Sequence, residues 1–252
     1  MTAASQGEGG IDLLVQQRFF PEAKGRVFVE VGAARPDYLS MSALFRSSGW
    51  KVLLVEPNPE FCALHRAAGH EVLQYACADF EADDLSFSVV DSRGEAYRDG
   101  HVSFESFSAI SVKDSYRRLR PDLEIRQIPV QVRRLDTLLR SHAPDVEKID
   151  ILSVDVEGWE LEVLKGLSMD RYRPTVIILE NFLDDPGYSQ YLARAGYVLW
   201  RRSSPNDVYV RAEELSPAFR FVLRTFTGAM TVARRIRAAV LRTTRAARKR
   251  RP

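Results

Sequence analysis

The chain has 252 residues, of which 45% are hydrophobic, enough for one sizeable core but not for a second full domain. Its two cysteines, Cys62 and Cys77, have neither the spacing of a disulfide framework nor that of a zinc site, so we expect a cytoplasmic protein. A signal peptide and a membrane span are not expected, because the N-terminus lacks basic and apolar regions and no run of about 18 apolar residues occurs.

The net charge of +2 is unevenly distributed along the chain. Residues 216–252 hold 11 Arg and Lys and no Asp or Glu, which leaves residues 1–215 with a net charge of −9. Such an asymmetry indicates an acidic body and a basic tail with a role of its own. We therefore expect one domain over 1–215 and a separate tail over 216–252.

Helical and extended patterns alternate through the first half of the body. In chain order they predict a helix over 11–20, a strand over 27–31, a helix over 40–48, a strand over 51–56, a helix over 60–68, a strand over 71–76 and a half-exposed strand over 85–91. Between 92 and 125 the pattern indicates no more than a helix near 112–119.

The second half continues this alternation and ends in a hairpin. It predicts an extended segment over 125–135, a helix over 135–142, a strand over 149–156, a helix over 159–167, a strand over 175–181, a helix over 187–195 and an antiparallel pair over 197–202 and 207–211. Buried strands that alternate with helices predict an α/β fold, with a mostly parallel sheet and an antiparallel edge hairpin. In such sheets ligands bind at the carboxyl ends of the strands.

The first two strands end in acidic and small residues. Glu30 precedes Gly32 and Ala33, which let a ligand approach the backbone closely, and the second strand ends at Glu56. The spacing is not that of a dinucleotide-binding loop. An acid at Glu30 suits an ammonium group, and one at Glu56 suits ribose hydroxyls. Together they predict an aminoacyl-nucleoside, S-adenosylmethionine, although a plain tight turn and a solvated acid are the alternatives.

The string Ser153-Val-Asp-Val-Glu-Gly-Trp-Glu160 places two carboxylates, Asp155 and Glu157, where a buried strand meets a helix. Capping of that helix needs one acidic residue at most, so the second carboxylate points to function. We predict that both lie at the catalytic end of the sheet.

Five segments resemble, in their usual order, the motifs of FkbM-type methyltransferases: VFVEVGA (27–33), LLVEPNP (53–59), LDTLL (135–139), SVDVEGWELEVLKG (153–166) and VIILEN (176–181). The likeness covers roughly residues 25–200 and is most specific in the D-x-E-G-x-E string. It implies a Rossmann-like methyltransferase fold and O-methylation of sugar hydroxyls and of related hydroxyls in polyketide and glycolipid products. The family usually has Asp where this chain has Glu30.

The same resemblance implies roles for individual residues. Glu30, Gly32 and Ala33 would face the methionine part of the cofactor, and Glu56 would bind its ribose. Ala78 and Asp79 would lie near the adenine, and Asp155 and Glu157 would lie at the catalytic end of the sheet.

The strand over 175–181 ends in Glu180-Asn181, and Asp155 ends its neighbour. This resembles the metal triad of catechol O-methyltransferase-like enzymes. Two carboxylates and an amide oxygen suit Mg²⁺ or another divalent cation, which would lower the pKa of a substrate hydroxyl. The alternative is that Asp155 and Glu180 bind substrate hydroxyls or act as a general base without metal.

Several other side chains are less specific. We expect His65, His70 and His142 to be solvated or to cap helices. We expect His101 to lie on the surface, and its alternative role is that of a general base. The aromatic residues Trp159 and Phe182 follow two motif strands and suit either sugar stacking or core packing.

The tail repeats apolar residues at helical spacing from 219 to 240, with arginines between them. A basic amphipathic helix of this kind suits an anionic membrane surface, at the inner face of the membrane for a cytoplasmic protein. Docking on the body or in an oligomer is the alternative. Nucleic acid is not expected, because basic and aromatic residues do not interleave.

We predict a methyltransferase that acts on a hydroxyl of a sugar, glycoside or glycolipid. The alternatives are a small non-sugar natural-product acceptor, or a non-catalytic cofactor-binding scaffold tethered to the membrane.

Overall fold

The computed structural model of the chain describes residues 5–21, 24–91, 96–97, 102–103, 108, 124–182 and 184–216. The helix predicted near 112–119, His101 and the tail beyond 216 lie outside these residues. Within the described ranges, no helix combines the length and the apolar character that crossing a membrane requires.

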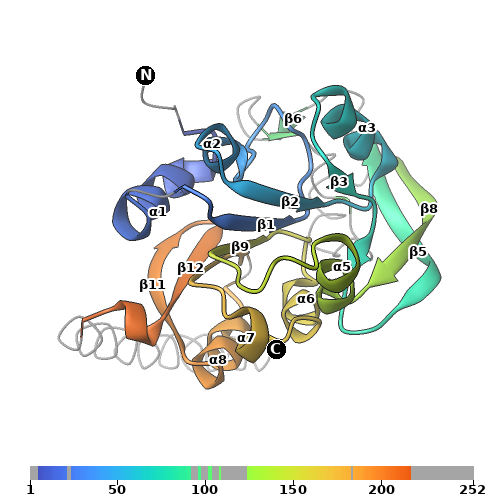
Figure 1. Cartoon of the computed structure of the whole chain (residues 1–252). Helices are drawn as coiled ribbons and strands as arrows, with labels where there is room; N and C mark the ends of the chain where they lie inside the picture. Colours follow the sequence, from blue (N-terminus) through green and yellow to red (C-terminus); the bar gives the residue numbers. More distant parts are fainter. Residues whose placement is uncertain are drawn as a thin grey trace, which may run out of the picture.

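Among the described residues, seven strands form the main sheet (Figure 1). From one edge to the other they are β11 (Tyr197–Ser203), β12 (Asn206–Arg211), β10 (Val176–Glu180), β9 (Ile151–Val154), β1 (Val27–Val31), β2 (Lys51–Val55) and β3 (Val72–Leu73). All pairs from β10 to β3 are parallel, whereas β12 runs antiparallel to both β10 and β11. This confirms the predicted α/β fold with its antiparallel edge hairpin.

The strand order creates a switch point between β1 and β9. The chain places β2 and β3 on one side of β1 and then returns to place β9 and β10 on the other side. At such a point the connections leave in opposite directions, which opens a crevice at the carboxyl ends of the strands.

Helices cover both faces of the sheet (Figure 1). Buried side chains of α1 and α2 pack on one face, and those of α5, α6 and α8 pack on the other. The described helices are α1 (Ile11–Phe19), α2 (Ala43–Ser47), α3 (Pro59–Ala67), α5 (Leu135–His142), α6 (Glu160–Lys165), α7 (Met169–Tyr172) and α8 (Pro186–Arg194), with 3₁₀ turns η1 (Glu8–Gly10) and η3 (Ala212–Glu214).

Side chains of the central strands alternate between these two layers. In β10, Ile177 and Leu179 pack with α5, α6 and α8, while Val176 and Ile178 pack with α1 and α2. Because both faces are covered, the central strands appear in the sequence as continuous apolar runs.

The segment 71–76, predicted as one strand, is divided between two sheets. β3 ends at Leu73, and the chain then turns so that β4 (Ala76–Cys77) pairs with β8 (Glu124–Arg133). β8 also pairs with β5 (Ala82–Asp91), and the short β6 (Ala96–Tyr97) pairs with β7 (Val102–Ser103). Both halves of 71–76 are extended and apolar, so the pattern could not reveal the change of partner.

Candidate active site

A cavity opens at the carboxyl ends of β1, β9 and β10, beside the switch point. Four of the buried polar residues that line it each stand at the end of a row of side chains that is apolar deeper in the sheet. One comes from each of β1, β9, β10 and β12, and they are Glu30, Ser153, Glu180 and Asn206. These positions face the same side because alternate residues of paired strands share a face.

Most of the predicted site residues meet at this cavity. Those that line it are Glu30, Gly32, Ala33, Glu56, Asp155, Glu157 and Glu180. Ala78, Asp79 and Asn181 are not among the lining residues.

Glu30 is a buried carboxyl group, with 5% of its surface exposed. Its Oε1 accepts the N–H of Met41 at 3.1 Å, and its Oε2 is buried without a hydrogen-bond partner among the described residues. Burial raises its pKa from 4.5 to about 7, against the opposing influence of Ser42 and Arg46. A buried acceptor without a donor is costly, so this oxygen suits a positively charged donor in the cavity.

Gly32 is required by a close chain crossing. Its φ is +84°, and a Cβ atom at this position would lie 1.7 Å from the backbone carbonyl oxygen of Asp155. The loop after β1 therefore crosses the loop after β9 with no room for a side chain. This contact brings the predicted cofactor loop against the predicted catalytic loop.

Glu56 joins two loops through its carboxylate. Oε2 accepts the N–H of Ala34 at 2.9 Å, and Oε1 accepts the N–H of Asn58 at 2.8 Å. Burial, with a smaller contribution from Glu30, raises its pKa to about 7 despite these bonds. Each carboxylate oxygen has lone pairs for about two hydrogen bonds and accepts one here, so Glu56 retains acceptor capacity toward the cavity.

The loop that follows β9 is held by Glu160 at the start of α6. Its Oε1 accepts the N–H groups of Val156 and Gly158 at 3.2 and 2.8 Å, and its Oε2 accepts the hydroxyl of Tyr188. Glu157 adopts a left-handed conformation with φ of +56°. The final acid of the D-x-E-G-x-E string thus has a structural role, because it fixes the turn that presents the first two acids.

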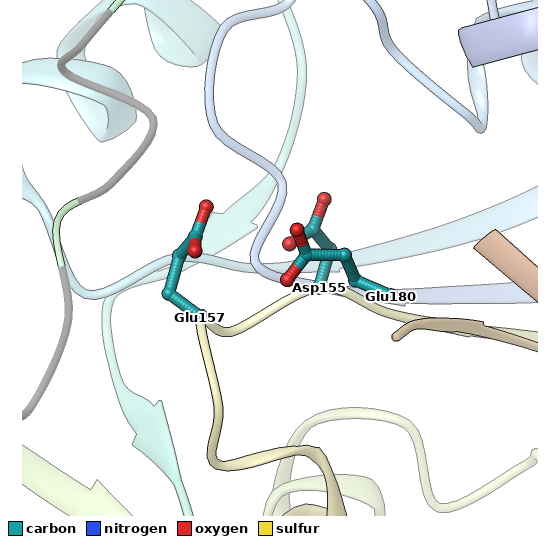
Figure 2. Close-up of side chains that lie close together, drawn as sticks. All are labelled: Asp155, Glu157 and Glu180. Atoms are coloured by element: carbon teal, nitrogen blue, oxygen red, sulfur yellow. The ribbon is translucent and has the colours of Figure 1, made fainter. Parts of the chain in front are cut away.

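Three carboxylates gather at this end of the cavity. Oxygen atoms of Asp155, Glu157 and Glu180 all lie within 4.8 Å of one another. Figure 2 shows the three side chains extending toward the same side from the loop after β9 and the end of β10. A cluster of hard oxygen donors matches the ligand preference of Mg²⁺ or Ca²⁺.

The structure corrects the place of Asn181 in the predicted metal set. Its Nδ2 donates to Asp207 at 2.9 Å and to the carbonyl of Asp185 at 3.3 Å, and its Oδ1 accepts the N–H of Asp185 at 2.7 Å. These bonds turn the amide toward the hairpin rather than the cavity. Glu157 is the third carboxylate of the cluster, whereas the amide of Asn181 bonds to Asp185 and Asp207.

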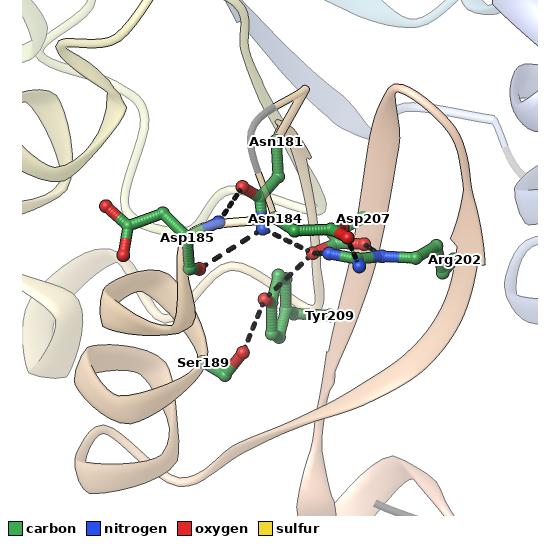
Figure 3. Close-up of polar contacts among 7 residues, drawn as sticks. All are labelled: Asn181, Asp184, Asp185, Ser189, Arg202, Asp207 and Tyr209. Carbon is green, nitrogen blue, oxygen red and sulfur yellow. Dashed lines mark hydrogen bonds and ion pairs between the residues drawn. The ribbon is translucent and has the colours of Figure 1, made fainter. Parts of the chain in front are cut away.

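Asn181 belongs to a buried polar network between the loop after β10 and the edge hairpin (Figure 3). Arg202 binds both carboxylate oxygens of Asp207 at 2.6 and 2.7 Å, and it also contacts Asp184. Tyr209 donates to the same Asp207 carboxylate at 3.3 Å. The network fixes the hairpin whose turn residues line the cavity.

The residues predicted near the adenine lie beside the cavity rather than in it. Ala78 is fully buried against the end of α6, where its carbonyl would lie 2.3 Å from a Cβ at Gly166. Asp79 is exposed, and its carbonyl accepts from Arg134. The preceding residues Ala76 and Cys77 line the cavity instead, because the chain has already changed sheets at this point.

Sequence reasoning missed a hydrogen-bonded polar pair in the cavity wall. Glu8, in η1, and Asn206, in β12, both line the cavity, and the Asn206 amide donates to Glu8 at 2.8 Å. Asp12 holds the N-terminal segment there by accepting the N–H groups of Gln6 and Gly7 at 3.0 Å. Almost two hundred residues separate Glu8 from Asn206 in the sequence, so no local pattern could join them.

The sequence left the positions of two aromatic side chains and several histidines undecided. Trp159 and Phe182 both line the cavity. His65, expected to be solvated or capping, has no exposed surface, whereas His142 is exposed.

The cavity is strongly acidic. Among the described residues that line it, the carboxylates are Glu8, Glu30, Glu56, Asp155, Glu157 and Glu180, whereas Arg35 is the only Lys or Arg. Such a lining opposes a phosphate-bearing dinucleotide and attracts a cation.

The family model of the methyltransferase FkbM domain matches residues 30–199. The chain is 44% identical over 52 residues to methyltransferase sdnD of Sordaria araneosa, covering 18% of this chain and 20% of that protein. Its fold is similar to the crystal structure of methyltransferase FkbM from Methylobacillus flagellatus KT, with a TM-score of 0.45, 14% identity and coverage of 74% of this chain and 43% of that one. Precorrin-6y C5,15-methyltransferase from Geobacter metallireducens GS-15 gives a TM-score of 0.38 and 12% identity over 83% of this chain and 91% of that one. The matched regions span less than half of the first two proteins.

Proposed function

Because this chain belongs to the FkbM methyltransferase family, we propose that it is an S-adenosylmethionine-dependent O-methyltransferase that modifies a hydroxyl of a sugar, glycoside or glycolipid. The acidic cavity at the switch point carries this proposal. S-adenosylmethionine bears a sulfonium and an ammonium group, and both favour a carboxylate-rich site that excludes anionic ligands.

One end of the cavity fits the cofactor. The unpaired Oε2 of Glu30 is an acceptor for the ammonium group, and the loop at Gly32 has no side chain to block it. Glu56 stands at the end of the neighbouring strand, the usual place for an acid that binds ribose hydroxyls. Ala76 and Cys77 supply apolar surface for the adenine base. They follow Leu73 in the chain, and the N–H of Glu56 donates to the Leu73 carbonyl, so this surface lies near the ribose site.

The carboxylate cluster at the other end suits binding of the acceptor and removal of the proton from its hydroxyl group. Bound S-adenosylmethionine supplies an electrophilic methyl carbon on its sulfonium sulfur. Asp155 is the exposed member of the three-carboxylate cluster, so it is placed to accept the proton as the hydroxyl oxygen forms its new bond to carbon. Glu157 and Glu180 hold the acceptor through its hydroxyl groups.

We also propose that this cluster takes a divalent cation. Three carboxylates within 4.8 Å repel one another unless a proton or a metal neutralises part of their charge. A bound cation would lower the pKa of the acceptor hydroxyl. In that arrangement Asp155, Glu157 and Glu180 would hold the cation, in place of the direct contacts with the acceptor described above.

Aromatic side chains support a ring-shaped acceptor. Trp159 and Phe182 approach the cavity from the loops after β9 and β10, the same loops that carry the carboxylate cluster. Sugar rings stack on aromatic faces and leave their hydroxyls for polar contacts. Glu8 and Asn206 add polar groups to the cavity wall from outside the family-matched residues 30–199.

The proposal is tested by a pair of measurements on the full chain. Isothermal titration with S-adenosylhomocysteine should show binding, and radiolabelled S-adenosylmethionine should transfer its methyl group to members of a panel of glycosides and glycolipids. Transfer only to non-sugar hydroxyl compounds would favour the small natural-product alternative. Binding without transfer to any member would favour the non-catalytic scaffold.

For the basic tail we propose attraction to an anionic membrane. Support comes from its 11 cationic residues without an acid, set against a body of opposite charge. An enzyme whose acceptor is a glycolipid gains from this, because the acceptor is confined to the membrane. Docking of the tail on the acidic body is the competing arrangement.

A further inference from the structure

Ala34 shapes the wall of the cavity in an unfavourable backbone conformation. It follows Gly32 and Ala33 in the loop after β1, lines the cavity and has a φ of +44°. A residue with a Cβ atom adopts this left-handed conformation only when its surroundings hold it there. The question is which groups hold Ala34.

Both polar groups of Ala34 are bound by side chains. Its N–H donates to Oε2 of Glu56 at 2.9 Å. Its carbonyl oxygen lies 3.1 Å from Nε2 of His65. A carbonyl oxygen only accepts, so the hydrogen must be on Nε2 of His65.

His65 is itself fixed in place. It has no exposed surface and lies on the buried face of α3 with Phe61 and Cys62. Its Nδ1 lies 3.3 Å from Nδ1 of His70. With hydrogen on Nε2, the Nδ1 atom of His65 accepts and that of His70 donates. Burial, chiefly, lowers the pKa of His65, which agrees with this neutral form.

The same helix also holds Glu56. The Sγ of Cys62 donates to the Glu56 carbonyl at 3.1 Å, and Asn58, which caps α3, donates its N–H to the Glu56 carboxylate. Thus α3 controls both ends of Ala34: one through Glu56 and the other through His65.

We propose that His65 is a positioning residue for cofactor binding, which holds the loop of residues 32–34 in its binding form through a hydrogen bond to the Ala34 carbonyl. His65 is absent from the residues that line the cavity, so it acts on the cofactor only through this loop. The inference rests on the proposed function, in that the loop contacts S-adenosylmethionine.

Replacements of His65 that differ in the position of one donor test the proposal. In His65→Gln the amide nitrogen stands as many bonds from Cα as Nε2 does, so it can still donate to Ala34. In His65→Asn the amide nitrogen stands one bond closer, and in His65→Leu the donor is lost. Isothermal titration with S-adenosylhomocysteine should give a Kd for the Gln variant within about threefold of wild type and a roughly tenfold increase for the Asn and Leu variants.

Each titration is run at a temperature at which circular dichroism shows the variant to be folded. If the Leu variant does not fold, the comparison of Gln with Asn decides, since both bury an amide at the same site. Equal affinities in all variants, or an equal loss in Gln and Asn, would overturn the proposal. Absence of binding by the wild-type chain would instead overturn the proposed function, and this inference with it.

Discussion

Replacing Glu30 with Gln should stabilise the cofactor-free protein at alkaline pH and weaken cofactor binding. Burial raises the pKa of Glu30 from 4.5 to about 7. The folded state therefore binds the proton more tightly than the unfolded state does. The resulting stability is fully present below pH 4.5 and is lost as pH rises through 7. This difference is worth roughly 3 kcal/mol for a buried group.

Gln has nearly the same shape as protonated Glu and carries no charge at any pH in this range. At a pH of about 4, below the unfolded-state pKa, the Gln variant should unfold close to the wild-type temperature. At a pH of about 8 it should unfold roughly 5–10 °C higher, because the cost of a buried charge is removed. The second buried acid, Glu56, reinforces this direction, since Glu30 contributes to its raised pKa.

Thermal unfolding followed by circular dichroism between about pH 4 and 8.5, without cofactor, measures the first effect. Titration with S-adenosylhomocysteine at about pH 8 measures the second, and we expect a loss of roughly tenfold or more because the ammonium group loses its carboxylate. Glu71→Gln, at an exposed site, is the matched control and should change neither property. A Glu30→Gln protein that is less stable than wild type at this alkaline pH, or that binds as tightly, would refute the reasoning.

Further outcomes are expected. Glu56→Ala should weaken S-adenosylhomocysteine binding by roughly 1–3 kcal/mol in titrations, whereas Asp155→Asn should preserve binding and suppress methyl transfer. Chelation with EDTA should also abolish transfer, and Mg²⁺ should restore it. Full activity after exhaustive chelation would favour the alternative in which the carboxylates act as a general base without metal. Gly32→Ala should destabilise the chain by more than roughly 3 kcal/mol in urea unfolding, because its Cβ would overlap a carbonyl at 1.7 Å; wild-type stability would mean that the crossing is loose. Arg202→Met should cost roughly 3 kcal/mol by removing the cationic partner of the buried Asp207 carboxylate, and an unchanged melting temperature would argue against the network. Truncation after Leu215 should abolish sedimentation with anionic liposomes and leave the cofactor affinity unchanged. If truncation instead lowers the melting temperature, and neither the full nor the truncated chain binds liposomes, the tail docks on the body.

Local patterns were sufficient for the strands of the main sheet other than β3. The strands at 27–31 and 175–181 could be predicted because helices cover both faces, so that their side chains are apolar until the acid near the end of each strand. The acids at the ends of these rows stand out for the same reason, and in a parallel sheet the carboxyl ends meet at one edge. Glu30, Asp155 and Glu180 thus follow from the sequence as residues of one site.

Other features depend on contacts between segments far apart in the chain. The split of 71–76 between two sheets depends on pairing with β8, which lies much later in the chain. The orientation of Asn181 depends on Asp207 in the hairpin, and the entry of Glu8 into the cavity depends on Asn206. None of these pairs has a periodicity or spacing that a local pattern could detect.

The sequence by itself determined the α/β class and the strand ends that carry the acids, because burial and turn chemistry act over a few residues. The family followed from the resemblance of five short motifs and their order. Only the tertiary structure decided which acids form the cluster, which residues hold Ala34 in its left-handed conformation, and why position 32 must be glycine. These features arise where loops from different strands cross, and the distance between two loops is set by the packing of the whole sheet rather than by either loop alone.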